Sequence, residues 1–93
     1  MSEECAYRWR IAGRVQGVGF RWSVLDRARA LDVVGWARNM PDGSVEVVAR
    51  GLPNALDRLD EFLATGPTHA HVEDVDKVHI PHESVAGNAF TIK

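Results

Sequence analysis

The stretch Gly13-Arg-Val-Gln-Gly-Val-Gly-Phe-Arg21 decides the fold of this chain. An alternating apolar run before it predicts a strand, and the pattern after it predicts a helix. Its three glycines allow backbone with positive φ and let a ligand approach the main chain closely. A strand that turns sharply into a helix directs several backbone N–H groups and the positive end of the helix dipole at one place. The stretch therefore predicts a strand–loop–helix unit that can hold a small anion.

Arg21 stands in the first turn of the predicted helix and carries a planar fork of N–H donors. A fixed cation beside glycine-rich amides favours a phosphate-sized ligand. The glycines alone are equally typical of a tight turn without a ligand. The stretch is not a Walker A loop, because no Gly-Lys-Ser/Thr follows, and its glycine spacing differs from the dinucleotide fingerprint.

The remaining sequence predicts one small domain. Upstream of the loop, residues 7–13 alternate apolar and mostly arginine side chains, as a half-buried strand does. Downstream, apolar residues recur from Phe20 to Leu31 and predict an amphipathic helix that ends near Asp32. Beyond it we expect two strands, Val33–Asn39 and Ser44–Arg50, joined by the turn Pro41-Asp42-Gly43. A second helix should begin at Pro53 or Asn54 and end at Thr65. A bent or bulged strand, Val72–Ile80, and a short last strand, Ala89–Ile92, follow it.

This order, β-α-β-β-α-β with a short C-terminal strand, predicts an α+β fold. Two such halves with right-handed crossovers give a ferredoxin-like sandwich with one antiparallel sheet and both helices on one face. The 93 residues fit a single domain, residues 1–93, with one modest core. The fold hosts many functions, so it does not decide the activity.

Composition bounds the class of protein. There is no long apolar run and no signal pattern at the N-terminus, so we expect a cytoplasmic protein without a membrane partner. Cys5 is the only cysteine, which excludes an intrachain disulfide. The net charge is −2, but residues 1–50 carry eight arginines against six acids. The basic half contains the glycine loop, which suits a small anion better than a polyanion.

Two separated segments carry a family resemblance. The stretch 13–21, followed by Gly35-Trp-Ala-Arg-Asn39 and Asp42-Gly-Ser-Val-Glu46, strongly resembles the signatures of the acylphosphatase family. Gly66-Pro67, Ala70, Val72 and Val75 also match, and the ending Phe90–Lys93 resembles the terminal strand of the family. The match is highly specific in the first half of the chain and looser after residue 76. One departure is Leu31-Asp32-Val33, where the family usually has a glycine after the first helix. A left-handed residue there prefers Gly, so Asp32 puts local stability in question.

The resemblance implies a ferredoxin-like enzyme that hydrolyses the carboxyl-phosphate bond of small acyl phosphates without metal or cofactor. It implies that Arg21 binds phosphate and that Asn39 positions the attacking water. It also implies a phosphate-binding cradle of main-chain amides, those of Gln16, Gly17, Val18, Gly19 and Phe20. Inorganic phosphate, as the product, is expected to inhibit, and we expect a monomer.

The residue types agree with that chemistry. An acyl phosphate expels a carboxylate, whose conjugate acid has a pKa of about 4, so the leaving group departs without a proton. The site residues include no His, Cys, Asp or Glu, which fits acyl phosphates better than alkyl phosphates. No nucleophilic side chain stands in the loop, so no covalent intermediate is expected.

Three other interpretations remain open from the sequence. The loop could hold an anion or a phosphorylated partner without turnover, with Asn39 as a turn residue. A ferredoxin-like RNA binder would need stacking aromatics on the open sheet, for which Trp9 and Trp36 are candidates, but the acidic second half argues against nucleic acid. His69 and His71 alternate as a metal-binding pair could, without a carboxylate or Cys set to complete a site. The role of Trp22 is open.

Overall fold

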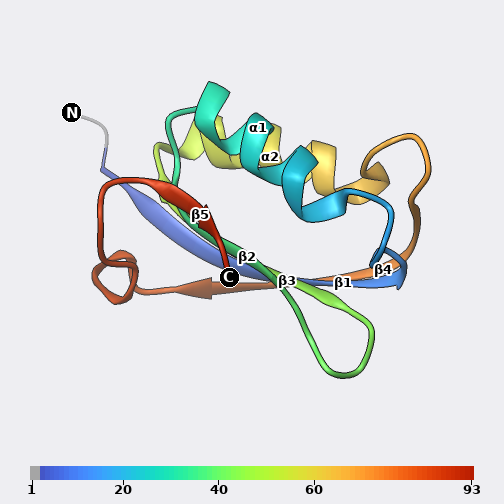
Figure 1. The fold of residues 1–93 in the computed structure, drawn as a ribbon. Coiled ribbons are helices and arrows are strands. Elements are labelled where there is room, and N and C mark those ends of the chain that lie inside the picture. Colours follow the sequence, from blue (N-terminus) through green and yellow to red (C-terminus); the bar gives the residue numbers. More distant parts are fainter. Residues whose placement is uncertain (1–2) are drawn as a thin grey trace.

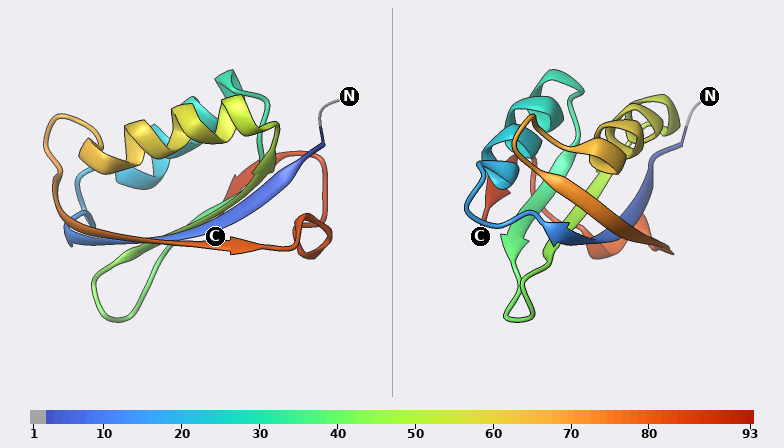
Figure 2. Two further views of the ribbon diagram at one scale, coloured as in Figure 1. Left: turned by 180° about the vertical axis from the view of Figure 1, so that it is seen from behind. Right: turned by 90° about the vertical axis from the view of Figure 1, so that its right-hand side faces the viewer.

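The computed structural model describes residues 3–93. It contains five strands, two α-helices and one short 3₁₀ helix, in the order β1 Cys5–Arg14, α1 Phe20–Ala30, β2 Val34–Asn39, β3 Val45–Gly51, α2 Pro53–Thr65, β4 His71–Ile80, η1 His82–Ser84 and β5 Phe90–Ile92. Both α-helices lie side by side on one face of the sheet, and the other face is open (Figure 1, Figure 2). No helix within the described range has the length and apolar content to cross a membrane.

The sheet confirms the ferredoxin-like prediction. The strand order is β4-β1-β3-β2-β5, and β1 to β4 pair antiparallel as expected. The short last strand β5 pairs parallel with β2, which makes the five-stranded sheet mixed. The predicted boundaries of the main elements lie within two residues of those observed, and η1 is a turn of helix that the sequence pattern did not predict.

The main core lies between the sheet and the helices. It includes the helix-facing residues of β1 and β3, such as Trp9, Ile11 and Val47, which are fully buried. Nε1 of Trp9 donates to Oδ1 of Asp60 on α2 at 2.8 Å, which satisfies the indole N–H of this buried ring. A smaller cluster on the open face joins Ala6, Val48 and Val85, and Trp36 packs against it. The burial of Trp9 removes it from any stacking surface for RNA bases.

Strand direction brings distant segments to one end of the sheet. β1 and β2 both run antiparallel to β3, and β5 runs parallel to β2, so the C-terminal ends of all three meet at the same edge. The β1–α1 loop and the β2–β3 hairpin therefore lie at the same end of the molecule (Figure 1). Ile11 and Asn39 both pair with Val45, so Asn39 lies two strand spacings, roughly 10 Å, from β1.

The fourth strand is bulged, as its irregular spacing predicted. Its register against β1 shifts between Ala12, which pairs with Asp74, and Gly13, which pairs with Val72. Glu73 is the extra residue in β4. The bulge lies near the C-terminal end of β1 and bends the sheet directly before the β1–α1 loop.

The predicted left-handed residue after the first helix is present. Asp32 has φ 58°, and it is the one non-glycine residue with positive φ in the described chain. Its N–H donates to the Arg29 carbonyl at 3.2 Å, and the Val33 N–H donates to the Ala28 carbonyl at 3.1 Å. These hydrogen bonds end the helix. The left-handed conformation costs steric energy at Asp32, because Asp32 has a Cβ that glycine lacks.

Replacing Asp32 with Gly is expected to raise the free energy of unfolding by roughly 0.5–1 kcal/mol, because glycine adopts this φ without a Cβ penalty. The measurement is a urea melt of Asp32→Gly beside the wild type. Asp26→Gly, in the interior of the same helix, is the matched control and should destabilise by about 1 kcal/mol. A lower stability for Asp32→Gly would show that the aspartate makes a stabilising contact at this position.

Candidate active site

The loop between β1 and α1 packs its apolar side chains into the core and exposes its glycine backbone to solvent. Val15 and Phe20 are each 1% exposed, and Val18 packs against the core between them. Gly17 and Gly19 face outward with φ 74° and 76°, the left-handed conformation that the glycines predicted. A Cβ added at either would meet no atom within 4 Å, so the space over the loop backbone is open to a ligand.

The loop amides lead directly into the N-terminus of α1. Gly19 is the N-cap, no side chain caps the helix, and its first turn holds no acidic residue. The first helical bond runs from the Ser23 N–H to the Gly19 carbonyl at 3.0 Å. In residues 3–93, the amides of residues 17–22 donate to no other group of the protein. Together with the helix dipole, these donors make a site for an anion.

Arg21 supplies the fixed charge beside these amides. Its side chain is half-buried, and Nη1 lies 3.4 Å from the main-chain oxygen of Lys93. Lys93 is held in turn by its N–H, which donates to the Ala37 carbonyl at 2.9 Å, and its Nζ lies 4.0 Å from the centroid of the Trp36 ring. Arg21 forms no ion pair with an Asp or Glu side chain in the described chain.

Asn39 ends β2 at the same edge of the sheet. It shares a face with Gly35 and Ala37, the face on which α1 lies, but it stands beyond the core and is exposed. Its backbone pairs with Val45, and its side chain makes no hydrogen bond to the part of the chain that the structure describes. A primary amide placed in this way has both a donor and an acceptor free for water.

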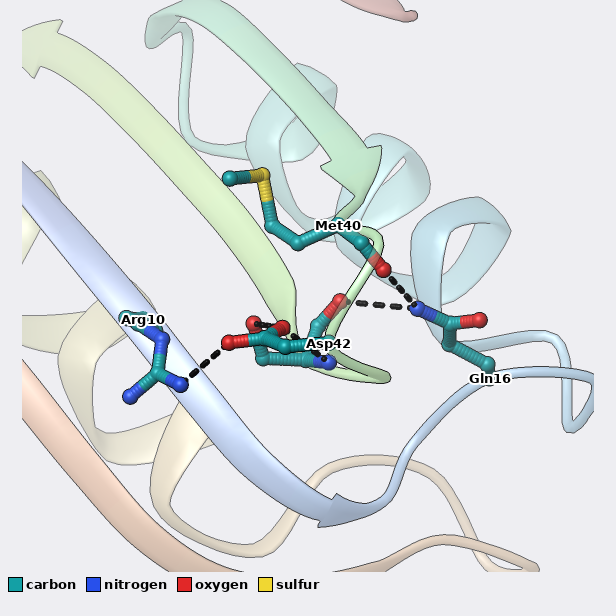
Figure 3. A network of polar contacts seen from close by, with 5 residues as sticks. Arg10, Gln16, Met40 and Asp42 are labelled. Carbon is teal, nitrogen blue, oxygen red and sulfur yellow. Dashed lines mark hydrogen bonds and ion pairs between the residues drawn. The ribbon is translucent and has the colours of Figure 1, made fainter.

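The side chain of Gln16 connects the loop to the hairpin. Its Nε2 donates to the carbonyls of Met40 and Ser44, each at 2.9 Å (Figure 3). The expectation for Gln16 concerned its main-chain amide alone. Sequence reasoning missed the side-chain contact, and the one available signal was a long amide side chain in a loop of otherwise small and apolar residues.

A second contact holds the hairpin from the open face. Oδ1 of Asp42 accepts from the N–H of Ser44 at 3.0 Å and from its hydroxyl at 2.6 Å, and Oδ2 pairs with Arg10 of β1 (Figure 3). The guanidinium of Arg10, followed by the two Ser44 donors, holds the pKa of the Asp42 carboxyl well below its usual range. The tip of the hairpin is therefore tied to β1 through a charged pair and braced internally through Ser44.

The other candidate residues lie away from this site. Trp22 is 65% exposed on the outer face of α1, and Cys5 packs against the core from β1. No group of three or more metal-ligating side chains gathers within residues 3–93. Two grooves of about 350 and 410 Å³ lie elsewhere, one beside Arg8 and Val78 and the other beside Trp36. The space over the backbone of Gly17 and Gly19 is open to solvent.

The fold is a small α+β sandwich, and its β1–α1 loop presents free main-chain amides at the N-terminus of a helix. The acylphosphatase family model matches residues 7–92. An acylphosphatase of Pseudomonas aeruginosa is 40% identical over 87 residues, which are 94% of each chain. A solved acylphosphatase structure from Coxiella burnetii is similar with a TM-score of 0.88 at 35% identity, covering 97% of this chain and 93% of that one. One from Bacillus subtilis has a TM-score of 0.88 at 37% identity, covering 96% and 98%.

The chain belongs to the acylphosphatase family. This confirms the family and the fold predicted from the two signature segments. It also confirms the predicted activity, hydrolysis of acyl phosphates, over the alternative of a binding module without turnover.

Asp42 gives the hairpin an acid-sensitive contact. Because its pKa is lowered on folding, the stability it adds is present above the unfolded pKa of about 3.9 and is lost as pH falls through the folded value. Asp42→Asn should therefore be less stable than the wild type at neutral pH, and the difference should shrink in acid and in high salt. Urea melts from about pH 7 to about pH 2 measure this. A difference that is constant over pH would contradict it.

Proposed function

We propose that the loop amides of residues 16–20, Arg21 and Asn39 form the site at which this chain hydrolyses its acyl phosphate. The observation that carries the proposal is the convergence of unpaired donors at one edge of the sheet. The amides of residues 17–22, an arginine that pairs with no Asp or Glu side chain of the described chain, and an exposed primary amide all lie at this edge. Each of these groups can donate to or orient an oxygen, and none is a nucleophile.

The amides and Arg21 hold the phosphoryl group. Phosphoryl transfer through a loose transition state spreads charge over three equatorial oxygens, so catalysis consists mainly of positioning and charge stabilisation. The planar fork of Arg21 can contact two of these oxygens at once. The loop amides and the helix dipole supply the remaining donors without any movement of charge in the protein.

Asn39 orients the water that attacks phosphorus. Its amide oxygen accepts a hydrogen bond from the water, but an amide is too weak a base to take the proton. The water oxygen forms a bond to phosphorus, and the phosphorus–oxygen bond to the acyl group breaks with its electron pair. The carboxylate leaves as the anion, since its conjugate acid has a pKa of about 4, and the water proton passes to a phosphate oxygen. The step needs neither a metal nor a covalent phospho-enzyme.

The proposal extends to the setting of the enzyme. Inorganic phosphate, the product, binds the same cradle and inhibits competitively. The chain acts as a single domain and a monomer in the cytoplasm, without a nucleic-acid or membrane partner. The burial of Trp9 and the contact of Lys93 with the ring of Trp36 support the absence of base stacking.

The deciding experiment is hydrolysis of an aryl acyl phosphate by the purified protein, with a chelator present, in ¹⁸O-labelled water. Release of phosphate that carries the label is expected, because the water attacks phosphorus. Label in the carboxylate would place the attack at the acyl carbon and overturn the mechanism. Phosphate binding without turnover would return the chain to the binding-module interpretation.

Arg21→Lys should lose most of its turnover and phosphate affinity, because a point charge does not reproduce the bidentate contact. A loss on the order of 3 kcal/mol, about 100-fold or more in kcat/KM, is expected. Arg29→Lys makes the same change at the other end of α1 and should leave both quantities unchanged. The measurements are kcat/KM and the rise in Tm that phosphate causes, against chloride at equal ionic strength. A kcat/KM of Arg21→Lys within about twofold of the wild-type value would contradict the assignment of Arg21 to the phosphoryl group.

Asn39→Ala should lower kcat by about two orders of magnitude, because its role lies at the chemical step. Phosphate affinity by calorimetry should change little, since the loop amides and Arg21 remain. Asn39→Asp should not rescue turnover, because it places a negative charge near the phosphoryl group. Asn88→Ala, an exposed loop position, is the control. Near-normal turnover of Asn39→Ala would leave Asn39 as a turn residue, and equal loss of binding and turnover would place it in the cradle.

A further inference from the structure

The loop and Asn39 belong to strands that are not neighbours. β3 lies between β1 and β2 in the sheet, so no ladder hydrogen bond joins the strand that carries the loop to the strand that carries Asn39. The loop lies beyond the end of β1, and Asn39 is the last paired residue of β2. The position of the loop relative to the Asn39 amide therefore depends on contacts outside the sheet as well as on the pairing of both strands with β3.

Gln16 makes such a contact through its side chain. A primary amide has two N–H donors, and those of Gln16 are used on the carbonyls of Met40 and Ser44, 2.9 Å away in each case. The oxygen of the same side chain points away from the hairpin (Figure 3). Across residues 3–93, these are the hydrogen bonds that connect the loop, residues 15–19, to the hairpin.

The two acceptors stand at the mouth of the hairpin turn. The Met40 N–H donates to the Ser44 carbonyl at 2.8 Å, and the Gly43 N–H donates to the Met40 carbonyl at 3.1 Å. Met40 directly follows Asn39 in the chain. A displacement of the Met40 carbonyl therefore moves the end of β2 from which the Asn39 side chain projects.

We propose that Gln16 is a positioning residue for the hydrolytic reaction, which sets the distance between the phosphate cradle and the Asn39 amide. The proposal rests on the proposed function, since it assigns Gln16 an effect only through Asn39. Both of its N–H donors are committed to main-chain carbonyls, so its side chain donates nothing to the substrate. Attack in line on phosphorus requires the water within a narrow range of positions, and a misplacement of about 1 Å can cost on the order of 100-fold in rate.

The variants Gln16→Met and Gln16→Glu test this. Methionine keeps the length of the side chain and removes both donors, whereas glutamate keeps the shape and turns an acceptor toward two carbonyls. Both should lower kcat by about 10- to 100-fold, while the inhibition constant of inorganic phosphate changes by less than about threefold. Arg10→Gln breaks the ion pair that holds the same hairpin from the open face, and it should retain the wild-type kcat.

A double-mutant cycle with Asn39→Ala separates positioning from a general loss of structure. In the Asn39→Ala background, Gln16→Met should lower kcat by less than about twofold further, because the group that it positions is absent. Losses that multiply would overturn the proposal. So would wild-type kcat in both Gln16 variants, or phosphate affinity that falls in step with kcat. Failure of both variants to fold, judged by melts beside the wild type, would also overturn it and make Gln16 a residue of stability.

The same data distinguish this proposal from the proposed function. A wild-type protein without turnover, or an Asn39→Ala variant with full turnover, would overturn the assignment of the site itself. In an active wild type whose turnover depends on Asn39, insensitivity to both Gln16 variants would overturn only the role of Gln16.

Discussion

The packing of Phe20 is the contact on which the loop depends. Phe20 is 1% exposed at the first position of α1, and its ring lies against Gly66, the C-cap of α2. A Cβ at Gly66 would come within 2.5 Å of Cε2 of Phe20, so the two helices and the loop meet at one point without spare room. Large-to-small changes at such a site leave a cavity in a well-packed core and cost about 3–5 kcal/mol. The buried side chain of Phe20 therefore fixes the position of the loop that carries the exposed amides.

Charge pairing separates Arg21 from most other arginines of the sheet region. Arg10, Arg38 and Arg50 pair with Asp42, Glu46 and Glu4, and these ion pairs compensate their charges. Arg21 pairs with no Asp or Glu side chain of the described chain and contacts a main-chain oxygen of Lys93 instead, which orients its guanidinium. An Asp or Glu side chain held against the guanidinium would compete with an incoming anion.

The sequence predicted the elements and the loop because those depend on local pattern. Period-two and helical spacings predicted the strands and helices, and the positive φ of Gly17 and Gly19 followed from residue type. The positive φ of Asp32 followed from the family resemblance, in which a glycine usually stands after the first helix. The contacts that it missed join residues far apart in the chain: Gln16 to Met40 and Ser44, 24 and 28 positions away, and Trp9 to Asp60, 51 away. The parallel pairing of β5 was missed for the same reason, since three residues fix no partner on their own. Side-chain partners over such separations are set by the tertiary fold and produce no periodic pattern in the sequence.

The composition of the proposed site limits the substrates that it could hydrolyse. Its groups are main-chain amides, a guanidinium and a primary amide, none of which can donate a proton to a strongly basic leaving group at neutral pH. An alkyl phosphate expels an alkoxide and would need such a donor or a metal, whereas a carboxylate needs neither. In the proposed site, the loop amides, Arg21 and Asn39 contact the phosphoryl group and the water, and none is assigned to the acyl part. The proposal therefore expects selectivity to follow the leaving-group pKa, so that small acyl phosphates of different structure should be hydrolysed at rates that follow the acidity of the acid released.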